Sequence, residues 1–467
     1  MKKVLAVLAF LAIVASPAFA AIQNVKVSGD IDSTYLNRNH FGLGVKAAGF
    51  PSQEQGLVKQ SVFFTQTRLR IDADLSDNVS TTVGLINERA WNAEGNNDTN
   101  VDLYLASATF REFLYSPLSI TVGRQVFAYG NGLILGDGGV NNVSSGNFQN
   151  IANDFTKRTA YDGIKAILDY KPLTLDLIYF KNNQRIVTGA LDAGVKSSSD
   201  VYGLNANYQL GDASNTVVEG YLFSRVNGDN NLATATDKKD TLYVPGLRVS
   251  TNPIKGLNVQ AEGAWQVGNK VVNAGTTTEE AEKRGAFAGQ LMTSYALPIE
   301  EKYKPSVNAS YTYVSGDKNG GATYASDRVK SAKVYRSWDV FNEAQGSGTI
   351  YNSLFNLTNM SIVAAGGQIT PLEDVTTSVL WSGLWLNNKT TGANPLALLQ
   401  PDGSTLPTLA TTGRKDLGNE YDVNVNYAYT EDVTFGLSLG WFVPGKTFGG
   451  ANDTTASQAV AHVLVNF

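Results

Sequence analysis

The last residues of the chain alternate between two series of positions, one of them apolar throughout. The apolar series is Ala459, Ala461, Val463, Val465 and Phe467, and the other is Gln458, Val460, His462, Leu464 and Asn466. Because successive side chains of a β-strand point to opposite faces, the first series would form an apolar face that ends in an aromatic ring. A strand whose outer face contacts lipid, with an aromatic ring at the membrane interface, has this pattern. The pattern therefore predicts a membrane-spanning strand that ends at Phe467.

The same alternation recurs along the rest of the chain, in segments bounded by turn residues. Eighteen strands are predicted, at 24–36, 61–75, 80–91, 100–112, 117–127, 159–170, 173–182, 199–210, 214–226, 240–250, 256–267, 283–296, 305–316, 358–370, 375–387, 417–430, 432–443 and 456–467. In one of them, Leu257, Val259 and Trp265 share one face, and Gln260 and Glu262 share the other. The apolar faces carry aromatic residues near their ends, as the interfacial girdles of a membrane barrel require.

Short and long links between these segments alternate. The long links, rich in Gly, Asn, Ser and Thr, are 37–60, 92–99, 126–158, 182–198, 227–239, 268–282, 316–357, 388–416 and 444–455. Outer-membrane barrels have an even strand number, short periplasmic turns and long extracellular loops. We therefore predict an all-β fold, a transmembrane antiparallel β-barrel of about 18 strands. A β-propeller would show a repeat of about 40–50 residues, which we do not find, and a β-sandwich would not need long loops on one side only.

The N-terminus predicts export from the cytoplasm. Lys2 and Lys3 precede an apolar run from Val4 to Val14, and small residues follow up to Ala20. This is the pattern of a secretory signal peptide, since the run is too short to span a bilayer. We expect a signal peptide at 1–20 and one barrel domain at 21–467, surrounded by lipid in the outer membrane of a Gram-negative-type bacterium.

Charged residues occupy the polar faces of several predicted strands. On the second strand, one face carries Gln66, Arg68, Arg70, Asp72 and Asp74. The charges at corresponding positions of other strands are Lys165, Glu219, Arg225, Arg248, Glu262 and Asp422. A charge that faces lipid at mid-bilayer costs about 2–4 kcal/mol, so the register that turns these residues inward is preferred. Because eighteen strands enclose a lumen too wide for side chains to fill, the polar faces would line a pore.

The mixture of acids and bases in this set leaves two interpretations open. Rings of basic side chains attract anions, and acidic rings attract cations. Interleaved charges could hold an extended charged polymer or a small anion, and pair with one another when the pore is empty. Alternatively, they keep one another paired in a solvated lumen that selects nothing.

Composition argues against several other classes of protein. The chain has no Cys, so it has neither a disulfide framework nor a Cys-ligated metal site. Its net charge of −5 argues against a nucleic-acid partner. The two histidines, His40 and His462, fall in the first long link and the last strand, so we expect no base beside a nucleophile and no enzyme. We also predict no cofactor and no metal, since the Asp-Gly-Gly-Val-Asn run at 137–141 lacks the full ligand series of a calcium loop.

Three segments resemble the alginate-export family of outer-membrane barrels. They read TQTRLRIDADLSDNVSTTVGLINERAW at 65–91, VGRQVFAYGNGLILG at 122–136 and RTAYDGIKAILDY at 158–170. In that family an Arg-x-Arg strand, a Gly-Arg-Gln segment and an Arg-x-x-(aromatic)-Asp-Gly segment recur in this order. The resemblance implies an eighteen-stranded monomeric barrel with an electropositive lumen for an acidic polysaccharide such as alginate. The pore residues that it implies are Arg68, Arg70, Glu88, Arg89, Arg124 and Asp162.

Arg124 needs a local irregularity to take that role. Strict alternation with Ile120 and Val122 would turn its side chain toward lipid, whereas a β-bulge at Gly123, or a position above the membrane, would bring it inward. We favour the bulge.

The function predicted is a porin-like channel that passes a hydrophilic, anionic solute or polysaccharide. Another porin, of general diffusion or other specificity, is one alternative, and a non-conducting adhesin or structural barrel is another. The links 126–158 and 316–357 exceed the usual loop length, and we expect 126–158 to fold into the lumen. The last strand would pair with 24–36, and its end at Phe467 resembles the signal read by the barrel-assembly machinery.

Overall fold

The computed structural model describes residues 24–43, 59–91, 101–136, 153–183, 199–227, 239–272, 280–299, 301–317, 334–344, 348–389, 413–448 and 453–467. The expected signal peptide at 1–20 lies outside these ranges. No helix among the described residues is long and apolar enough to cross a membrane.

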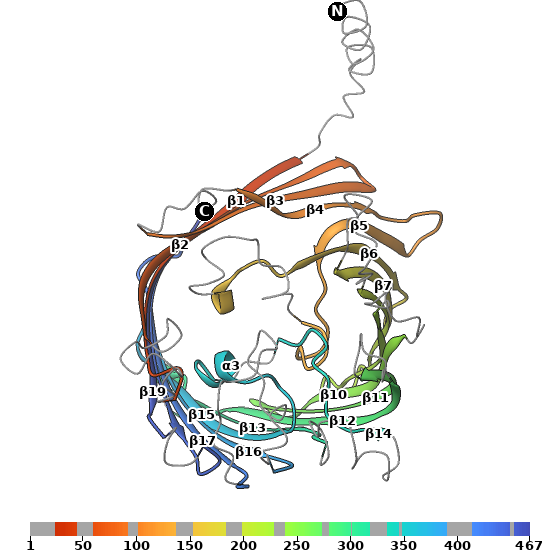
Figure 1. Cartoon of the computed structure of the whole chain (residues 1–467). Helices are drawn as coiled ribbons and strands as arrows, with labels where there is room; N and C mark the ends of the chain where they lie inside the picture. Colours follow the sequence, from red (N-terminus) through yellow and green to blue (C-terminus); the bar gives the residue numbers. More distant parts are fainter. Residues whose placement is uncertain are drawn as a thin grey trace, which may run out of the picture.

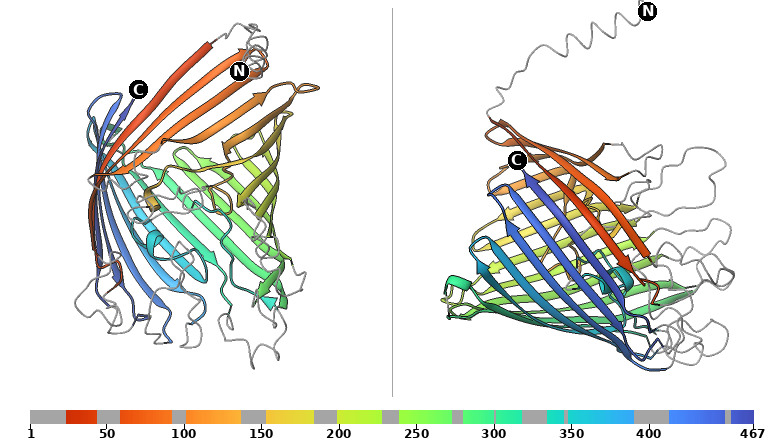
Figure 2. Two further views of the ribbon diagram at one scale, coloured as in Figure 1. Left: turned by 45° about the horizontal axis from the view of Figure 1, so that its top comes forward. Right: turned by 90° about the vertical axis from the view of Figure 1, so that its left-hand side faces the viewer.

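Eighteen antiparallel strands follow one another around a single closed sheet (Figures 1 and 2). They are β1 (Asn24–Asn39), β2 (Lys59–Ser76), β3 (Val79–Ala90), β4 (Asp102–Phe110), β5 (Leu118–Val126), β6 (Ala160–Asp169), β7 (Leu173–Asn183), β8 (Ser199–Gln209), β9 (Val217–Asn227), β10 (Asp240–Ile254), β11 (Leu257–Val272), β12 (Glu280–Ala296), β13 (Ser306–Val314), β15 (Met360–Leu372), β16 (Val375–Leu386), β17 (Asp416–Ala428), β18 (Val433–Pro444) and β19 (Ala456–Asn466). Each predicted segment overlaps one of these strands, so the predicted barrel is confirmed.

In the described parts of the links lie three short helical pieces and one additional strand. They are η2 (Asn153–Phe155), η3 (Glu301–Tyr303), α3 (Tyr351–Leu354) and β14 (Val334–Tyr335). The two residues of β14 pair in parallel with β12. α3 lies inside the ring of strands, and so does the segment that contains η2 (Figure 1).

The barrel closes where β1 pairs with β19. The register runs from Asp30 opposite Asn466 to Asn39 opposite Ser457. Beyond it, Gly29 and Phe467 exchange backbone hydrogen bonds of 2.8 and 3.0 Å. Lipid offers no hydrogen-bond partner to a free strand edge, so this pairing is what permits the sheet to span a membrane. Recognition of the Phe467 strand by the assembly machinery and the monomeric state stay predictions.

The outer face of the wall is apolar. Exposed side chains on it include Leu247, Leu291 and Val379, each more than half exposed. Trp265 and Trp441 are exposed nearer the long-loop ends of their strands. This face is the one that lipid would cover, with rings at the interface.

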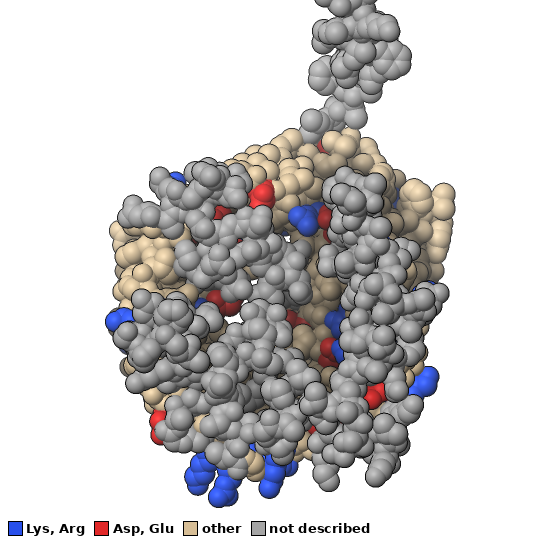
Figure 3. Space-filling view, viewed as in Figure 1, with Lys and Arg blue, Asp and Glu red and all other residues tan. Residues whose placement is uncertain are grey.

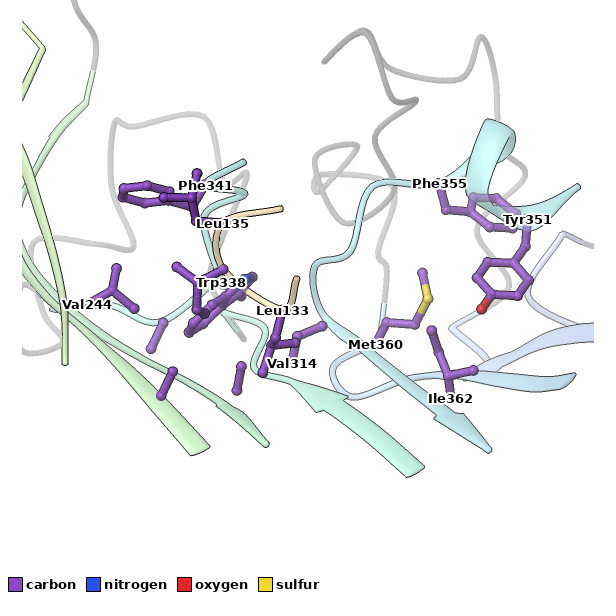
Figure 4. Close-up of a cluster of buried hydrophobic side chains, with 14 of the residues drawn as sticks. Leu133, Leu135, Val244, Val314, Trp338, Phe341, Tyr351, Phe355, Met360 and Ile362 are labelled. Atoms are coloured by element: carbon purple, nitrogen blue, oxygen red, sulfur yellow. The ribbon is translucent and has the colours of Figure 1, made fainter. Parts of the chain in front are cut away.

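The inner face is not polar throughout, contrary to our expectation. A buried apolar cluster fills part of the interior toward the long-loop ends of the strands, and Figure 4 shows side chains of wall and loops meeting there. Wall residues in it include Val244, Val314 and Ile362, and loop residues include Leu133, Leu135, Trp338, Phe341, Tyr351 and Phe355. The long loops turn inward and need an apolar surface to pack on, which explains why these strands carry apolar residues on both faces.

At Gly123, β5 passes unusually close to β4. Gly123 has φ +117°, and a Cβ there would lie 2.1 Å from the carbonyl oxygen of Ala106. The Gln125 side chain donates to the carbonyl oxygen of Thr121 at 3.0 Å, which ties the same stretch from inside. β5 pairs in continuous register with both neighbours, so the predicted bulge is absent. Arg124 therefore keeps the outward face that strict alternation gives it.

Gly123→Val should destabilise the barrel, because a side chain would be forced both into a left-handed φ and against the β4 backbone. We expect a cost of about 1–3 kcal/mol or more, seen as a lower midpoint for heat-induced loss of the folded band on a gel. Gly220→Ala is the matched control, since the nearest atom to its added Cβ is 4.0 Å away. An equal loss in both variants would contradict this role of Gly123.

Candidate functional site

Two loop segments enter the barrel and pair with each other there. Leu135 and Asn342 form a parallel bridge, and the Ala344 N–H donates to the Gly132 carbonyl oxygen at 2.8 Å. The first segment is 127–136 and the second is 334–344, which α3 follows. Together they narrow the interior and place their own polar groups against the charged residues of the wall.

One group of charges joins β1–β4 to η2 and the residues after it, and we call it the β1–β4 charge cluster. Its members are Asp30, Asp32, Arg38, Arg68, Arg70, Asp72, Glu88, Asp102, Asp154, Lys157 and Arg158. Lys157 Nζ lies 3.1 Å from Asp30 and 2.9 Å from Asp32. Arg158 bridges two strands, since it pairs with the buried Glu88 and lies 2.7 Å from Asp102. Acidic and basic side chains are visible within the opening of the barrel in Figure 3.

A second group of charges holds the loop segment 334–344, and Asp339 is its centre. Lys270 and Arg284 lie 2.9 and 2.6 Å from the Asp339 carboxylate, and Arg225 lies 3.7 Å away. Arg284 also lies 2.6 Å from Asp240. Burial alone would raise the pKa of Asp339, but the three cations hold it well below its usual range. The carboxylate therefore stays charged and fastens the loop to β9, β11 and β12.

The other loop segment contacts a third group of wall residues. Arg248 donates to Glu219 at 3.2 Å and to Asn131 of the loop at 3.2 Å. Tyr221 donates to Glu262 at 2.6 Å on the neighbouring wall. The segment 127–136 is thus fastened to the wall by hydrogen bonds from its polar groups as well as by its apolar side chains.

α3 is held by a carboxylate of β17. Glu420 on β17 accepts hydrogen bonds from the backbone N–H groups of Thr349, Ile350 and Tyr351 at 2.5, 2.8 and 2.6 Å. Asp422 accepts from the Thr349 hydroxyl at 2.7 Å. The N–H groups of Ile350 and Tyr351 are among those that the first turn of a helix leaves unsatisfied, so the wall supplies the cap for α3.

Most predicted site residues lie on the inward face. The structure places these there: Arg68, Arg70, Asp72, Glu88, Lys165, Glu219, Arg225, Arg248, Glu262 and Asp422. Arg68, Arg70, Asp72 and Glu88 come together in one cluster, while the others lie along the remaining wall beneath the loops.

Three predicted residues face outward, and the prediction that they line the pore was wrong. Arg89 follows the inward Glu88 directly, and adjacent strand residues must face opposite sides. Arg124 and Asp162 pair across β5 and β6, 3.3 Å apart, on the same face as the exposed Ile164.

Several inward charges escaped the sequence interpretation. Asp30, Asp32 and Arg38 alternate on β1 and could have been found from that period, and Arg284 on β12 could have been found in the same way. Asp339 lies in an irregular loop segment, where no periodicity indicates a direction.

The comparisons with known proteins agree on one class. The model of the alginate export family matches residues 41–462. The fold is similar to OccD3 (OpdP) of Pseudomonas aeruginosa, with a TM-score of 0.55, 12% identity, and 96% of this chain and 92% of that chain covered. None of the curated protein sequences compared with the chain matches it.

Two further similar structures from Pseudomonas aeruginosa contain a ligand. OccK2 (OpdF), solved with glucuronate, has a TM-score of 0.51 and 11% identity, with 96% of this chain and 98% of that chain covered. OpdK, solved with vanillate, has a TM-score of 0.54 and 11% identity, with 96% and 99% covered. Identities in this range show a shared fold.

Asp339→Asn should release the loop segment 334–344, because three cations would lose their shared carboxylate. Loss of one member of a buried charge group costs about 3–5 kcal/mol. We expect hydrogen exchange in 334–344 to accelerate by at least about tenfold, while Asp212→Asn, in a tight turn at the other end of the barrel, leaves it unchanged. Equal exchange in the Asp339 variant and the wild type would show that apolar packing alone holds the loop.

Glu343 makes the same loop segment sensitive to pH. Burial raises the pKa of its carboxyl to about 7 from an ordinary value of 4.5. The docked loop therefore binds more protons than the undocked loop between these two values, and docking weakens as the pH rises through about 7. We expect 334–344 to exchange faster in the wild type than in Glu343→Gln at pH 8, and at equal rates at pH 4. A constant ratio of the two rates across this range would contradict the assignment.

Proposed function

The chain belongs to the alginate export family, and we propose that its barrel passes an anionic solute, a polyuronate such as alginate among the candidates. The family and the fold are those of outer-membrane transport barrels. What has to be argued from the chain itself is the charge of the solute.

The observation that carries the proposal is a series of cations along one side of the interior. From the short-turn end, the register of β1 and β2 places Lys26 opposite Asp72, then Ser28 opposite Arg70, then Asp30 opposite Arg68. Lys157 follows beside Asp30, and Arg38 lies near the other end of β1. A solute that moved along this side would meet a basic group at each step.

Exposure favours Arg68, Arg70 and Lys157 over their acidic partners, whereas Arg38, at 7%, is less exposed than its partner Asp154, at 23%. Arg68 is 33% exposed while its partner Asp30 is 9% exposed, and their contact of 2.6 Å uses only one nitrogen of Arg68. Arg70 is 48% exposed and pairs with Asp72 at 2.7 Å. A guanidinium has five N–H donors, so both arginines keep donors for a second carboxylate. The acids orient these arginines, and the interior offers donors to an anion.

The ligands in the similar structures are consistent with this chemistry. Glucuronate in OccK2 is a uronate, and vanillate in OpdK is also a carboxylate. General diffusion is the second candidate function, because so many inward charges are already paired with one another.

Arg68→Gln combined with Arg70→Gln should weaken anion preference in planar bilayers. Since each unit charge at 4 Å is worth about 1 kcal/mol in water, we expect the chloride-to-potassium permeability ratio to fall by about fivefold or more. The outward Arg89→Gln is the matched control and should leave the ratio unchanged.

Polyuronate and neutral oligosaccharide of equal length distinguish the two candidate functions. We expect the polyuronate alone to block the wild-type current, and to block the double variant more weakly. Equal block by both oligosaccharides, or an unchanged permeability ratio in the double variant, would establish general diffusion instead.

A further inference from the structure

Four alternating charges cross the outer face of the barrel from β5 to β8. Arg124 is the register partner of Asp162, Asp162 of Lys181, and Lys181 of Asp200. Lys181 and Asp200 form an ion pair, and Arg124 lies 3.3 Å from Asp162. We call these four residues the outer ionic row.

The row shares its face with side chains that point away from the interior. Val122, Ile164 and Leu204 lie two or four residues from a row member on the same strand, so they share its face. Each of the three is more than 40% exposed. Asp162 itself is 67% exposed. The row is therefore no part of the charged interior described above.

The height of the row on the barrel follows from counting along the strands. Arg124 and Tyr179 are each six residues from the short-turn ends of their strands, Leu118 and Leu173. Asp162 and Tyr202 are each seven residues from the short-turn ends of theirs, Asp169 and Gln209. Arg124 and Asp162 therefore lie at about the same height on the barrel as the two tyrosines.

The remaining two charges lie higher than the first two. Tyr179 and Tyr202 pack 5.1 Å apart on this outer face, as rings at the membrane interface do. Lys181 and Asp200 lie two residues beyond them, toward the long-loop end. The row thus begins at the level of these rings and rises above them, where lipid headgroups lie.

The wall beside the row fixes one of its cations in place. The ladder between β4 and β5 ends with Ala106 opposite Arg124. Beyond this pair, Arg124 donates through Nη1 to the carbonyl oxygen of Leu103 at 3.3 Å. The side chain thus takes the place of the backbone N–H that would bond to this oxygen if the ladder continued. The guanidinium is held against the wall, while the exposed Asp162 carboxylate extends outward beside it.

We propose that the outer ionic row binds the phosphorylated headgroup of a glycolipid in the outer leaflet. Arg124 and Lys181 donate to phosphate oxygens, which cations recognise through charge-assisted hydrogen bonds. Asp162, which is 67% exposed, binds a divalent cation that the same phosphates also ligate, since carboxylate and phosphate oxygens are the ligands that Mg²⁺ and Ca²⁺ prefer. The alternating signs thereby match a layer in which phosphates and divalent cations alternate.

The test uses the full-length protein extracted from outer membranes in mild detergent. Bound glycolipid phosphate is measured per barrel after exhaustive detergent exchange. Arg124→Gln combined with Lys181→Gln removes both cations, and Arg111→Gln, at a tight turn on the opposite side of the membrane, is the control. We expect the double variant to retain at least about tenfold less glycolipid, because it lacks both cations that donate charge-assisted hydrogen bonds to the phosphates. The control should retain as much as the wild type.

Two further measurements distinguish a phosphate site from nonspecific retention of lipid. Chelation of divalent cations, or Asp162→Asn, should lower retention by the wild-type barrel, and enzymatic removal of the glycolipid phosphates should abolish it without any change to the protein. Retention that is equal in the wild type and the double variant, or that survives dephosphorylation, overturns the proposal. So does a wild-type dimer that the double variant converts to monomers, since the row would then bind a second copy of the chain.

Discussion

Everything in this molecule depends on the satisfaction of backbone hydrogen bonds where there is no water. A sheet can cross lipid only if its first and last strands pair, and here β1 and β19 do so. Closure fixes the inner and outer face of every strand at once, because the side-chain period of two leaves no freedom once the register is set. The cations of β1 and β2 face the interior for this reason, and the exposed leucines and aromatics face lipid.

The long loops are controlled by buried carboxylates of two kinds. Asp339 belongs to a loop and is held by cations of the wall, whereas Glu420 belongs to the wall and holds the N–H groups that begin α3. Both arrangements satisfy polar groups that would otherwise be buried without partners. The apolar cluster around Trp338 supplies the remaining contact surface. The interior is therefore a packed assembly of wall and loops, with the cations of β1 and β2 along one side.

The strands were predictable because alternation is a strong and repeated signal, and the closing pair followed from strand count and turn lengths. The predicted direction of a side chain was wrong where it was assigned from a family motif and not from the alternation along the strand. Arg89 stands next to Glu88, so both could not face inward, and Arg124 follows the alternation that the expected bulge at Gly123 would have broken. The Gly-Arg-Gln segment has a physical reason of its own, since glycine permits the close approach to β4 and Gln125 ties β5 from inside. The position of Asp339 could not be predicted, because irregular loop backbone carries no period.

The short ladder between β4 and β5 makes the wall mechanically uneven. Only five residue pairs join these strands, against ten between β1 and β19, where the two ends of the chain meet. Local opening of a protein occurs where the fewest backbone bonds must break. The weakest seam of the barrel is therefore an ordinary hairpin and not the join between its first and last strands. At the long-loop end of this ladder, the Arg124 side chain donates a hydrogen bond to the β4 backbone. This contact stabilises the pair of strands at the point where their separation would otherwise begin.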